Sequence, residues 1–216
     1  DSTVFNLHHN DIPGLAVAME LGSGEHLAWA FNMRGTDRLR AEAEEYFASI
    51  DESGRLEQIM DRYYGHPDDM SLLSRRTFAR HYDSRLSNYR ALFRQAGRNT
   101  QLDWRLLAAI GYQESHWDPT AVSPTGVKGL MMLTKATAEI MKVENREDPA
   151  QSIAAGARYL VRLQKRLRHI PEPDRTWLAL AAYNVGYAHL LDAQQIVRIQ
   201  GGNPHLWLDV KKALPL

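Results

Sequence analysis

The 216-residue chain carries 26 basic and 26 acidic residues and no cysteine, so its formal net charge is zero. A balanced chain lacks the basic excess typical of nucleic-acid-binding proteins, and without cysteine neither a disulfide nor a thiolate metal site can form. Apolar residues make up 44% of the chain, which is ordinary for a globular protein. No apolar run approaches the ~20 residues that span a bilayer.

Residues 1–68 are predicted to form a small α/β unit. Short stretches with an extended pattern alternate there with turn-forming Gly, Pro and Asn: 3–7, 15–21 and 27–31. Two helices are expected to follow, at 37–50 and 52–64. Gly-His-Pro-Asp-Asp at 65–69 then breaks the helical pattern, and we place a domain boundary there.

Residues 69–216 are predicted to form an all-α domain. Helical patterns follow one another along it: 74–96, 103–115, 134–141, 149–167, 176–184 and 187–199. Asp103, Asp148 and Asp174 are expected to start helices. Gly97, Gly186 and the pair at 201–202 are expected at or just beyond helix ends.

The helix predicted at 103–115 places a carboxyl group at the end of an apolar stripe. Leu107 and Ile110 lie on that stripe, and Glu114 follows one turn after Ile110. Burial and the partial negative charge of a helix C-terminus both disfavour a carboxylate, so the pKa of Glu114 is expected to rise. A carboxyl that stays protonated near neutral pH suits a general acid. The alternative is a helix-terminal glutamate that points to water or pairs with an arginine.

A long loop and a second apolar helix accompany this carboxyl. Residues 115–129 are rich in Pro and Gly and lead into Leu-Met-Met-Leu-Thr at 130–134. Long loops inside compact domains are often functional. Further on, Ala-Ala-Tyr-Asn-Val-Gly at 181–186 places a tyrosine and an asparagine at the end of an apolar helix.

These three segments resemble the catalytic domain of the lytic murein transglycosylases, whose fold is similar to that of goose-type lysozyme. Glu-Ser-His-Trp-Asp-Pro at 114–119 is similar to the first motif of that family. Ser-Pro-Thr-Gly at 123–126 with Gly-Leu-Met-Met at 129–132 is similar to the second, and Ala-Tyr-Asn-Val-Gly at 182–186 to the third. The family commonly has glutamine where this chain has Met132, so one group that hydrogen-bonds the sugar is missing.

The second motif looks like that of a membrane-bound branch of the family, branch F. This resemblance implies that residues 1–68 are the last part of a solute-binding-like regulatory domain. It implies that the chain stops at Leu216 before such catalytic domains usually end, so that part of the active-site wall would lie beyond it. It also implies a periplasmic protein held to the outer membrane by a lipid anchor, which would have to precede Asp1.

The reaction implied by the resemblance is the lytic cleavage of the β-1,4 bond between N-acetylmuramic acid and N-acetylglucosamine in peptidoglycan. Glu114 would protonate the glycosidic oxygen, and the substrate's N-acetyl oxygen would stabilise the developing cation. The carboxylate would then accept the proton of the muramyl C6 hydroxyl, which attacks the anomeric carbon and leaves a 1,6-anhydro end. No cofactor is implied. A hydrolytic muramidase on the same fold and a non-catalytic peptidoglycan-binding or regulatory module remain open alternatives.

Three polar residues match positions that contact substrate in the family. Ser123 would hydrogen-bond the N-acetyl group, or it is an ordinary loop serine. Tyr183 would orient Glu114 or the sugar, or it is a core tyrosine with a satisfied hydroxyl. Asn184 is expected to hold backbone at the helix end more than to touch substrate.

Apolar residues of the motifs have two interpretations each. Met131 is expected to pack in the groove or in the core, and Met132 to line a subsite. Trp117 would stack on a sugar face or anchor the core. Asp118, within Trp-Asp-Pro, is expected to cap a turn and not to act as a second catalytic acid.

The remaining charged residues give weaker indications. One face of the helix predicted at 149–167 is basic: Arg158, Arg162, Lys165, Arg166 and Arg168. Such a face is usually just solvated, and the alternative is contact with the acidic peptide stems of the cell wall. The nine histidines show no metal-ligand spacing, so we predict no catalytic metal.

Overall fold

The computed structural model describes residues 5, 16–19, 22, 28–32, 35–64 and 72–214. The chain divides into two compact units, Asp1–Phe78 and Ala79–Leu216. The division falls within helix α4 (Leu72–His81). The boundary predicted at 65–69 lies outside the described residues and stays a prediction.

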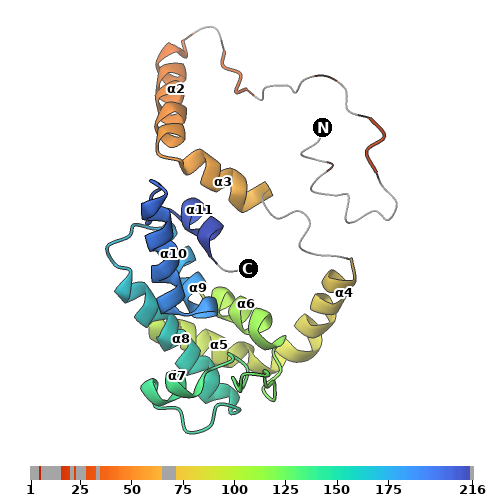
Figure 1. Ribbon diagram of the computed structural model, residues 1–216. Coiled ribbons are helices and arrows are strands. Elements are labelled where there is room, and N and C mark those ends of the chain that lie inside the picture. The colour runs from red at the N-terminus through yellow and green to blue at the C-terminus, as the bar shows by residue number, and fades with distance from the viewer. Residues whose placement is uncertain are drawn as a thin grey trace. The chain divides into compact units, whose positions relative to one another are not determined.

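Two helices are described in full in the first unit, α2 (Asp37–Glu52) and α3 (Arg55–Tyr64), as Figure 1 shows. Both were predicted, at 37–50 and 52–64. Gly54 between them has a φ of 68°, a left-handed conformation that glycine adopts without strain. The sequence therefore predicts both helices, but the break between them lies at 53–54 and not at 51 as predicted.

The extended stretches predicted ahead of these helices are only partly covered. Residues 16–19 and 28–32 belong to neither a helix nor a strand. Phe5 is helical, so the extended conformation predicted over 3–7 is wrong at that residue. The other residues of these stretches lie mostly outside the described part of the chain.

The second unit is built from helices, as predicted (Figure 1). After α4, its elements are η2 (Tyr82–Leu86), α5 (Ser87–Thr100), α6 (Trp104–Ser115), α7 (Lys135–Ile140), α8 (Pro149–Arg166), α9 (Asp174–Val185), α10 (Tyr187–Ile199), α11 (Trp207–Val210) and η3 (Lys211–Ala213). Helix α11 and the turn η3 were not predicted, because so few residues show no periodicity. None of the helices in the described residues has both the length and the apolar character that a bilayer span requires.

Helices α4, η2 and α5 follow one another without a break, as the single helix predicted at 74–96. The middle piece, η2, is a turn of π-helix. Gly97 does not end the helix, contrary to prediction, because α5 continues to Thr100 and stops at the left-handed Gln101. A Cβ on Gly97 would lie 2.8 Å from the Leu102 carbonyl oxygen, so glycine is needed there for the close return of the chain.

Side-chain caps begin several helices as predicted. Asp103 and Asp148 accept backbone N–H hydrogen bonds, of 2.8 and 2.7 Å, in the first turns of α6 and α8. Asp174 does not cap its own helix, because it already lies inside α9 and is buried. It accepts a 2.7 Å hydrogen bond from the backbone N–H of Trp207, which ties the start of α11 to the start of α9.

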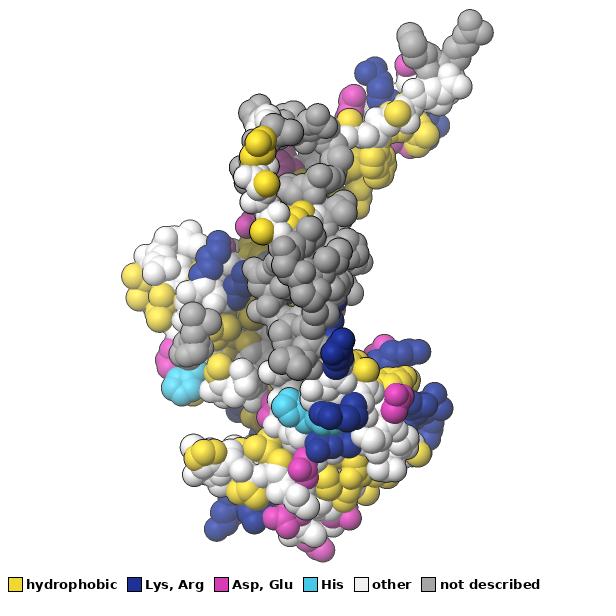
Figure 2. Space-filling model, turned by 90° about the vertical axis from the view of Figure 1, so that its right-hand side faces the viewer, with side chains coloured by type: hydrophobic (Ala, Val, Ile, Leu, Met, Phe, Trp, Pro, Cys, Tyr) yellow, Lys and Arg dark blue, Asp and Glu magenta, His cyan; other side chains and the backbone are white. Residues whose placement is uncertain are grey.

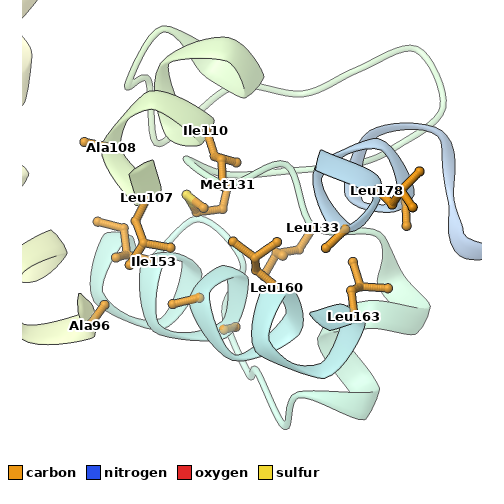
Figure 3. Packing of buried hydrophobic residues seen from close by; sticks show 14 of the residues in the cluster. Ala96, Leu107, Ala108, Ile110, Met131, Leu133, Ile153, Leu160, Leu163 and Leu178 are labelled. Atoms are coloured by element: carbon orange, nitrogen blue, oxygen red, sulfur yellow. The ribbon is translucent and has the colours of Figure 1, made fainter. Parts of the chain in front are cut away.

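The core of the second unit lies where α5, α6, α8 and α9 pack together. Figure 3 shows Leu107 of α6, Ile153 and Leu160 of α8 and Leu178 of α9 converging on this region. All four side chains are at most 1% exposed. Burying each such side chain stabilises the fold by roughly 1.5–3 kcal/mol. Outside the core, acidic, basic and hydrophobic side chains are interspersed on the face shown in Figure 2.

Candidate active site

Glu114 lies in the last turn of α6, and its carboxyl is partly withdrawn from water. This burial raises the pKa of Glu114 to about 7 from an ordinary value of 4.5. None of the described arginines or lysines forms an ion pair with the carboxyl. The alternative of a fully solvated or arginine-paired glutamate is therefore wrong. A carboxyl of this acidity exchanges its proton readily near neutral pH.

The chain turns sharply after Glu114. His116 and Trp117 both have left-handed backbone conformations, with φ values of 52° and 59°. The Trp117 indole N–H donates a 2.8 Å hydrogen bond to the Ala108 carbonyl, and only 2% of the residue is exposed. Trp117 therefore anchors the core, and the prediction that it stacks on a sugar face is wrong.

Ser115 joins the end of α6 to the loop ahead of α7. Its hydroxyl lies 2.8 Å from the Leu130 carbonyl oxygen and 3.1 Å from that of Gly111, and it accepts a hydrogen bond from the Asp118 N–H at 3.2 Å. Sequence analysis gave this serine no individual role, although it belongs to the Glu-Ser motif at 114–119. The contacts fix the backbone on which Glu114 is held.

Asp118 caps a turn, as predicted. Its carboxylate accepts hydrogen bonds from the backbone N–H and the hydroxyl of Thr120, at 2.9 and 2.7 Å. These hydrogen bonds, the side-chain one foremost, lower the pKa of Asp118. An acid held ionised in this way is unsuited to donating a proton.

Met131 is wedged between helices α6 and α8, as Figure 3 shows. A Cβ on Gly111 would lie 3.3 Å from the Met131 sulfur, and one on Gly156 would lie 2.8 Å from its terminal methyl carbon. The two glycines therefore make room for a side chain that is 0% exposed. Of the two interpretations of Met131, packing in the core is confirmed.

The backbone around Met131 is held by hydrogen bonds to side chains of two helices. Its N–H donates a 3.2 Å hydrogen bond to the Ser152 hydroxyl of α8. Its carbonyl accepts a 3.0 Å hydrogen bond from the Tyr183 hydroxyl of α9. Just before it, Gly129 has a φ of 84°, and a Cβ there would lie 1.8 Å from the Arg146 carbonyl oxygen. These contacts therefore restrict the backbone conformation of residues 129–131.

Tyr183 lies within electrostatic range of Glu114. Burial raises the pKa of the Tyr183 hydroxyl above its ordinary value, and the negative charge of Glu114 raises it further. The hydroxyl is already bonded to the Met131 carbonyl, and the ring centre lies 5.5 Å from that of Tyr159. Tyr183 is thus a tyrosine with a satisfied hydroxyl that supports the loop beside the carboxyl.

Ser123 is engaged within its own loop. Its hydroxyl accepts hydrogen bonds from the backbone N–H groups of Thr125 and Val127, both at 3.2 Å. It also lies 2.9 Å from the Thr125 hydroxyl. No hydrogen bond joins Ser123 to Glu114 in the described part of the chain. Contact of Ser123 with the N-acetyl group stays a prediction.

The remaining two candidates have accessible side chains. Asn184 is exposed, and across the described residues its side chain makes no hydrogen bond, so the expectation that it holds backbone is wrong. Met132 is half-buried and has a left-handed φ of 45°, between two fully buried neighbours in the loop. Its role in lining a subsite stays a prediction.

Two hollows open on the surface of this unit, with volumes of about 600 and 850 Å³. The first is lined by residues at the end of α5 and the start of α6, the second by residues of α5 and α8. Neither is lined by Glu114, Ser123 or Tyr183. The assignment of the candidate active site therefore rests on the acidity of Glu114 and on the electrostatic interaction between Glu114 and Tyr183.

Comparison with known proteins places the chain in a family. Over its full length it is 49% identical to a protein of Alcanivorax borkumensis named membrane-bound lytic murein transglycosylase F, and it covers 46% of that protein. It is 47% identical to proteins of the same name from Ectopseudomonas mendocina and Methylobacillus flagellatus, covering 44% and 46% of them. The chain thus spans about half the length of these relatives. Residues 91–205 match the family described as the Transglycosylase SLT domain, and the chain belongs to that family.

Proposed function

We propose that this chain contains the catalytic domain of a peptidoglycan lytic transglycosylase. Membership of the transglycosylase SLT domain family supports this reading over a muramidase or a binding module. The observation that carries it is the half-buried Glu114, whose pKa of about 7 suits an acid that must also act as a base. The bond cleaved is the β-1,4 link between N-acetylmuramic acid and N-acetylglucosamine.

Glu114 serves twice in the proposed reaction. Its protonated carboxyl gives its proton to the glycosidic oxygen as the bond from that oxygen to the anomeric carbon breaks. The N-acetyl oxygen of the muramyl residue stabilises the positive charge that develops. The carboxylate then removes the proton of the C6 hydroxyl as its oxygen bonds to the anomeric carbon. Glu114 is protonated again, and the muramyl residue ends as a 1,6-anhydro sugar with no water consumed.

The neighbouring residues have supporting roles in this proposal. Tyr183 and Ser115 hold the loop carbonyls of Met131 and Leu130, which keeps the loop next to Glu114. Ser123 binds the N-acetyl group through the remaining capacity of its hydroxyl. Asn184, which is exposed one residue after Tyr183, is available to hydrogen-bond the glycan.

Met132 is the loop residue that we propose to line a subsite. It lies between Met131 and Leu133, which are both buried, and its own side chain remains half-buried. A thioether packs against the apolar face of a sugar but donates no hydrogen bond. The subsite would therefore bind the glycan through packing where other family members use an amide.

The cellular setting is also a proposal. The relatives are named membrane-bound, and we infer that the longer protein works in the periplasm, held to the outer membrane by a lipid anchor. Residues 1–68 would be the end of a solute-binding-like regulatory domain. The glycan strand would be the substrate, and its peptide stems a further point of contact.

The test is mass spectrometry of the products from purified peptidoglycan. The parent protein is expected to release muropeptides with 1,6-anhydro ends, each one water lighter than a hydrolytic product. Glu114→Gln should release almost none, whereas the exposed Glu139→Gln should match the parent. Products with only reducing ends would establish a muramidase. Binding to the wall without any product from the parent would establish a binding module.

A further inference from the structure

One hollow on the second unit lies between the C-terminal end of α5 and the outward face of α8. It has a volume of about 850 Å³. Its walls are formed by Arg98, Asn99, Thr100, Gln101, Met141, Arg158, Val161, Arg162, Lys165 and Arg166. We call it the basic groove. On the opposite side of α8, Leu160 and Leu163 are buried in the core, so the groove faces away from the packed interior.

The charge of the basic groove is one-sided. Arg98, Arg158, Arg162, Lys165 and Arg166 line it, and no Asp or Glu does. This contrasts with the chain as a whole, in which 26 basic residues face 26 acidic ones. Cations gathered in a hollow without carboxylates attract an anion more strongly than the same charges scattered on a surface.

Two of these cations are held in place by uncharged groups. The Arg158 guanidinium donates a 2.9 Å hydrogen bond to the Met141 carbonyl. The Arg166 guanidinium lies 4.5 Å from the centre of the Tyr187 ring. Within the described part of the chain, neither Arg162 nor Lys165 has an ion-pair partner. Their charges are therefore available to a ligand, next to arginines that are already oriented.

The other walls of the groove indicate the kind of anion. The side chains of Asn99, Thr100 and Gln101 can hydrogen-bond amide groups. Met141 and Val161 add apolar surface suited to small aliphatic side chains. Carboxylates, amides and methyl groups occur together in an acidic peptide, whereas an inorganic phosphate uses only the cations.

We propose that the basic groove binds the carboxylate-bearing peptide stems of peptidoglycan, at a place separate from Glu114. This inference rests on the proposed function, because it takes the substrate polymer as the partner. The groove holds the enzyme on peptide-bearing wall while Glu114 acts on the glycan. Arginine forks bind carboxylates in pairs of hydrogen bonds, and the amides of the groove bind the peptide backbone.

The test is binding to insoluble peptidoglycan by the full chain with Glu114→Gln, so that the wall is not digested. Arg162→Glu with Lys165→Glu reverses two charges of the groove. Arg198→Glu with Lys212→Glu makes the same charge change at exposed residues outside the groove. Both proteins are compared on wall with its stems and on glycan from which an amidase has removed them.

The groove variant is expected to bind stem-bearing wall on the order of tenfold more weakly at low salt, with the difference shrinking at high salt. On stem-free glycan it should bind like its control. An equal loss in both variants, or no loss in either, would overturn the proposal. A groove-specific loss on vesicles of anionic phospholipid, with none on wall, would assign the groove to a membrane surface instead.

The outcome is separable from that of the proposed function. In parallel, stem-free glycan is digested with the parent protein, which has an intact Glu114, and the products are identified by mass spectrometry. Anhydro products with no groove-dependent binding would leave the proposed function intact and remove the groove from it. Groove-dependent binding without anhydro products would do the reverse.

Discussion

The end of α6 and the loop ahead of α8 each carry a glutamate, and their surroundings give these residues opposite acidities. Glu114 is partly buried, which raises its pKa to about 7, and among the described residues no cation pairs with it. Glu147 is exposed and accepts a 2.8 Å hydrogen bond from Lys128, which lowers its pKa. The difference shows that the pKa of each carboxyl is set by its exposure to water and by its ionic partner, and not by the residue type.

The largest difference that we expect between the two glutamates is in the rate of turnover. Glu114→Gln removes the exchangeable proton and should lower the rate of wall cleavage by at least about a hundredfold. Glu147→Gln removes only an exposed ion pair, which contributes little. It should change the rate by less than about threefold. Comparable rates for the two variants would show that Glu114 has no special role in cleavage.

The pH dependence of the parent follows from the raised pKa of Glu114. In the proposed mechanism only the protonated carboxyl can start the reaction, so kcat/KM should fall above about pH 7, by about tenfold per pH unit. Glu147 has a lowered pKa and is already ionised there, so Glu147→Gln should keep the same profile. Initial rates on soluble glycan between weakly acid and alkaline pH measure this. A limb with its midpoint near pH 4.5 would contradict it.

Removing the support of the loop should have a smaller effect. Tyr183→Phe deletes the 3.0 Å hydrogen bond to the Met131 carbonyl and leaves a buried acceptor without its partner. A loss of roughly 1–2 kcal/mol in the free energy of unfolding is expected. The rate should fall about tenfold through misplacement of the loop beside Glu114. Chemical denaturation measures the free energy of unfolding, and the rate of product release measures the activity.

A matched tyrosine separates positioning from simple destabilisation. Tyr159→Phe serves as the control, because Tyr159 is the ring neighbour of Tyr183 and, within the described part of the chain, the Tyr159 hydroxyl makes no hydrogen bond. If both variants lost stability and activity in equal measure, the specific role of the Tyr183 hydroxyl would be wrong.

The smallest effect is on stability and changes with pH. Because the folded state raises the pKa of Glu114, it binds that proton more tightly than the unfolded chain, and folding loses stability as pH rises from 4.5 through 7. Glu114→Gln does not show this loss of stability, because glutamine has no proton to lose in this pH range. After allowance for the exposed part of the carboxyl, it should be more stable than the parent by about 1 kcal/mol at pH 8 and no more stable at pH 4.

Thermal unfolding at the two pH values measures this difference. A change of that size raises Tm by about 2–4 °C for a domain of this length. Glu139→Gln, at an exposed position, should show no such pH-dependent gain. An equal gain at both pH values would indicate better packing of glutamine and not the removal of a charging cost.

The sequence predicts what depends on local pattern. The apolar stripe of Leu107 and Ile110 was sufficient to predict both α6 and the partial burial of Glu114. Capping by Asp103 and Asp148 was predictable because it acts within one helical turn. The three motifs, in order, were enough to identify the family.

What could not be predicted depends on contacts between distant segments. Met131 is buried because Gly111 and Gly156 on different helices leave space for it, and nothing near Met131 in the sequence shows this. Trp117 could not be assigned to the core before its bond to the Ala108 carbonyl was known. Asn184 was expected to bond backbone, yet the end of α9 leaves its side chain in solvent.

The acidity of Glu114 can be measured directly by following its side-chain carboxyl carbon with NMR as the pH is changed. A midpoint near 7 is predicted for Glu114, while Glu147 should titrate below 4.5 in the same spectra. Assignment comes from the loss of one signal in Glu114→Gln. A Glu114 midpoint near 4.5 would mean that the carboxyl is ionised at neutral pH, and this would contradict its role as the acid that starts cleavage.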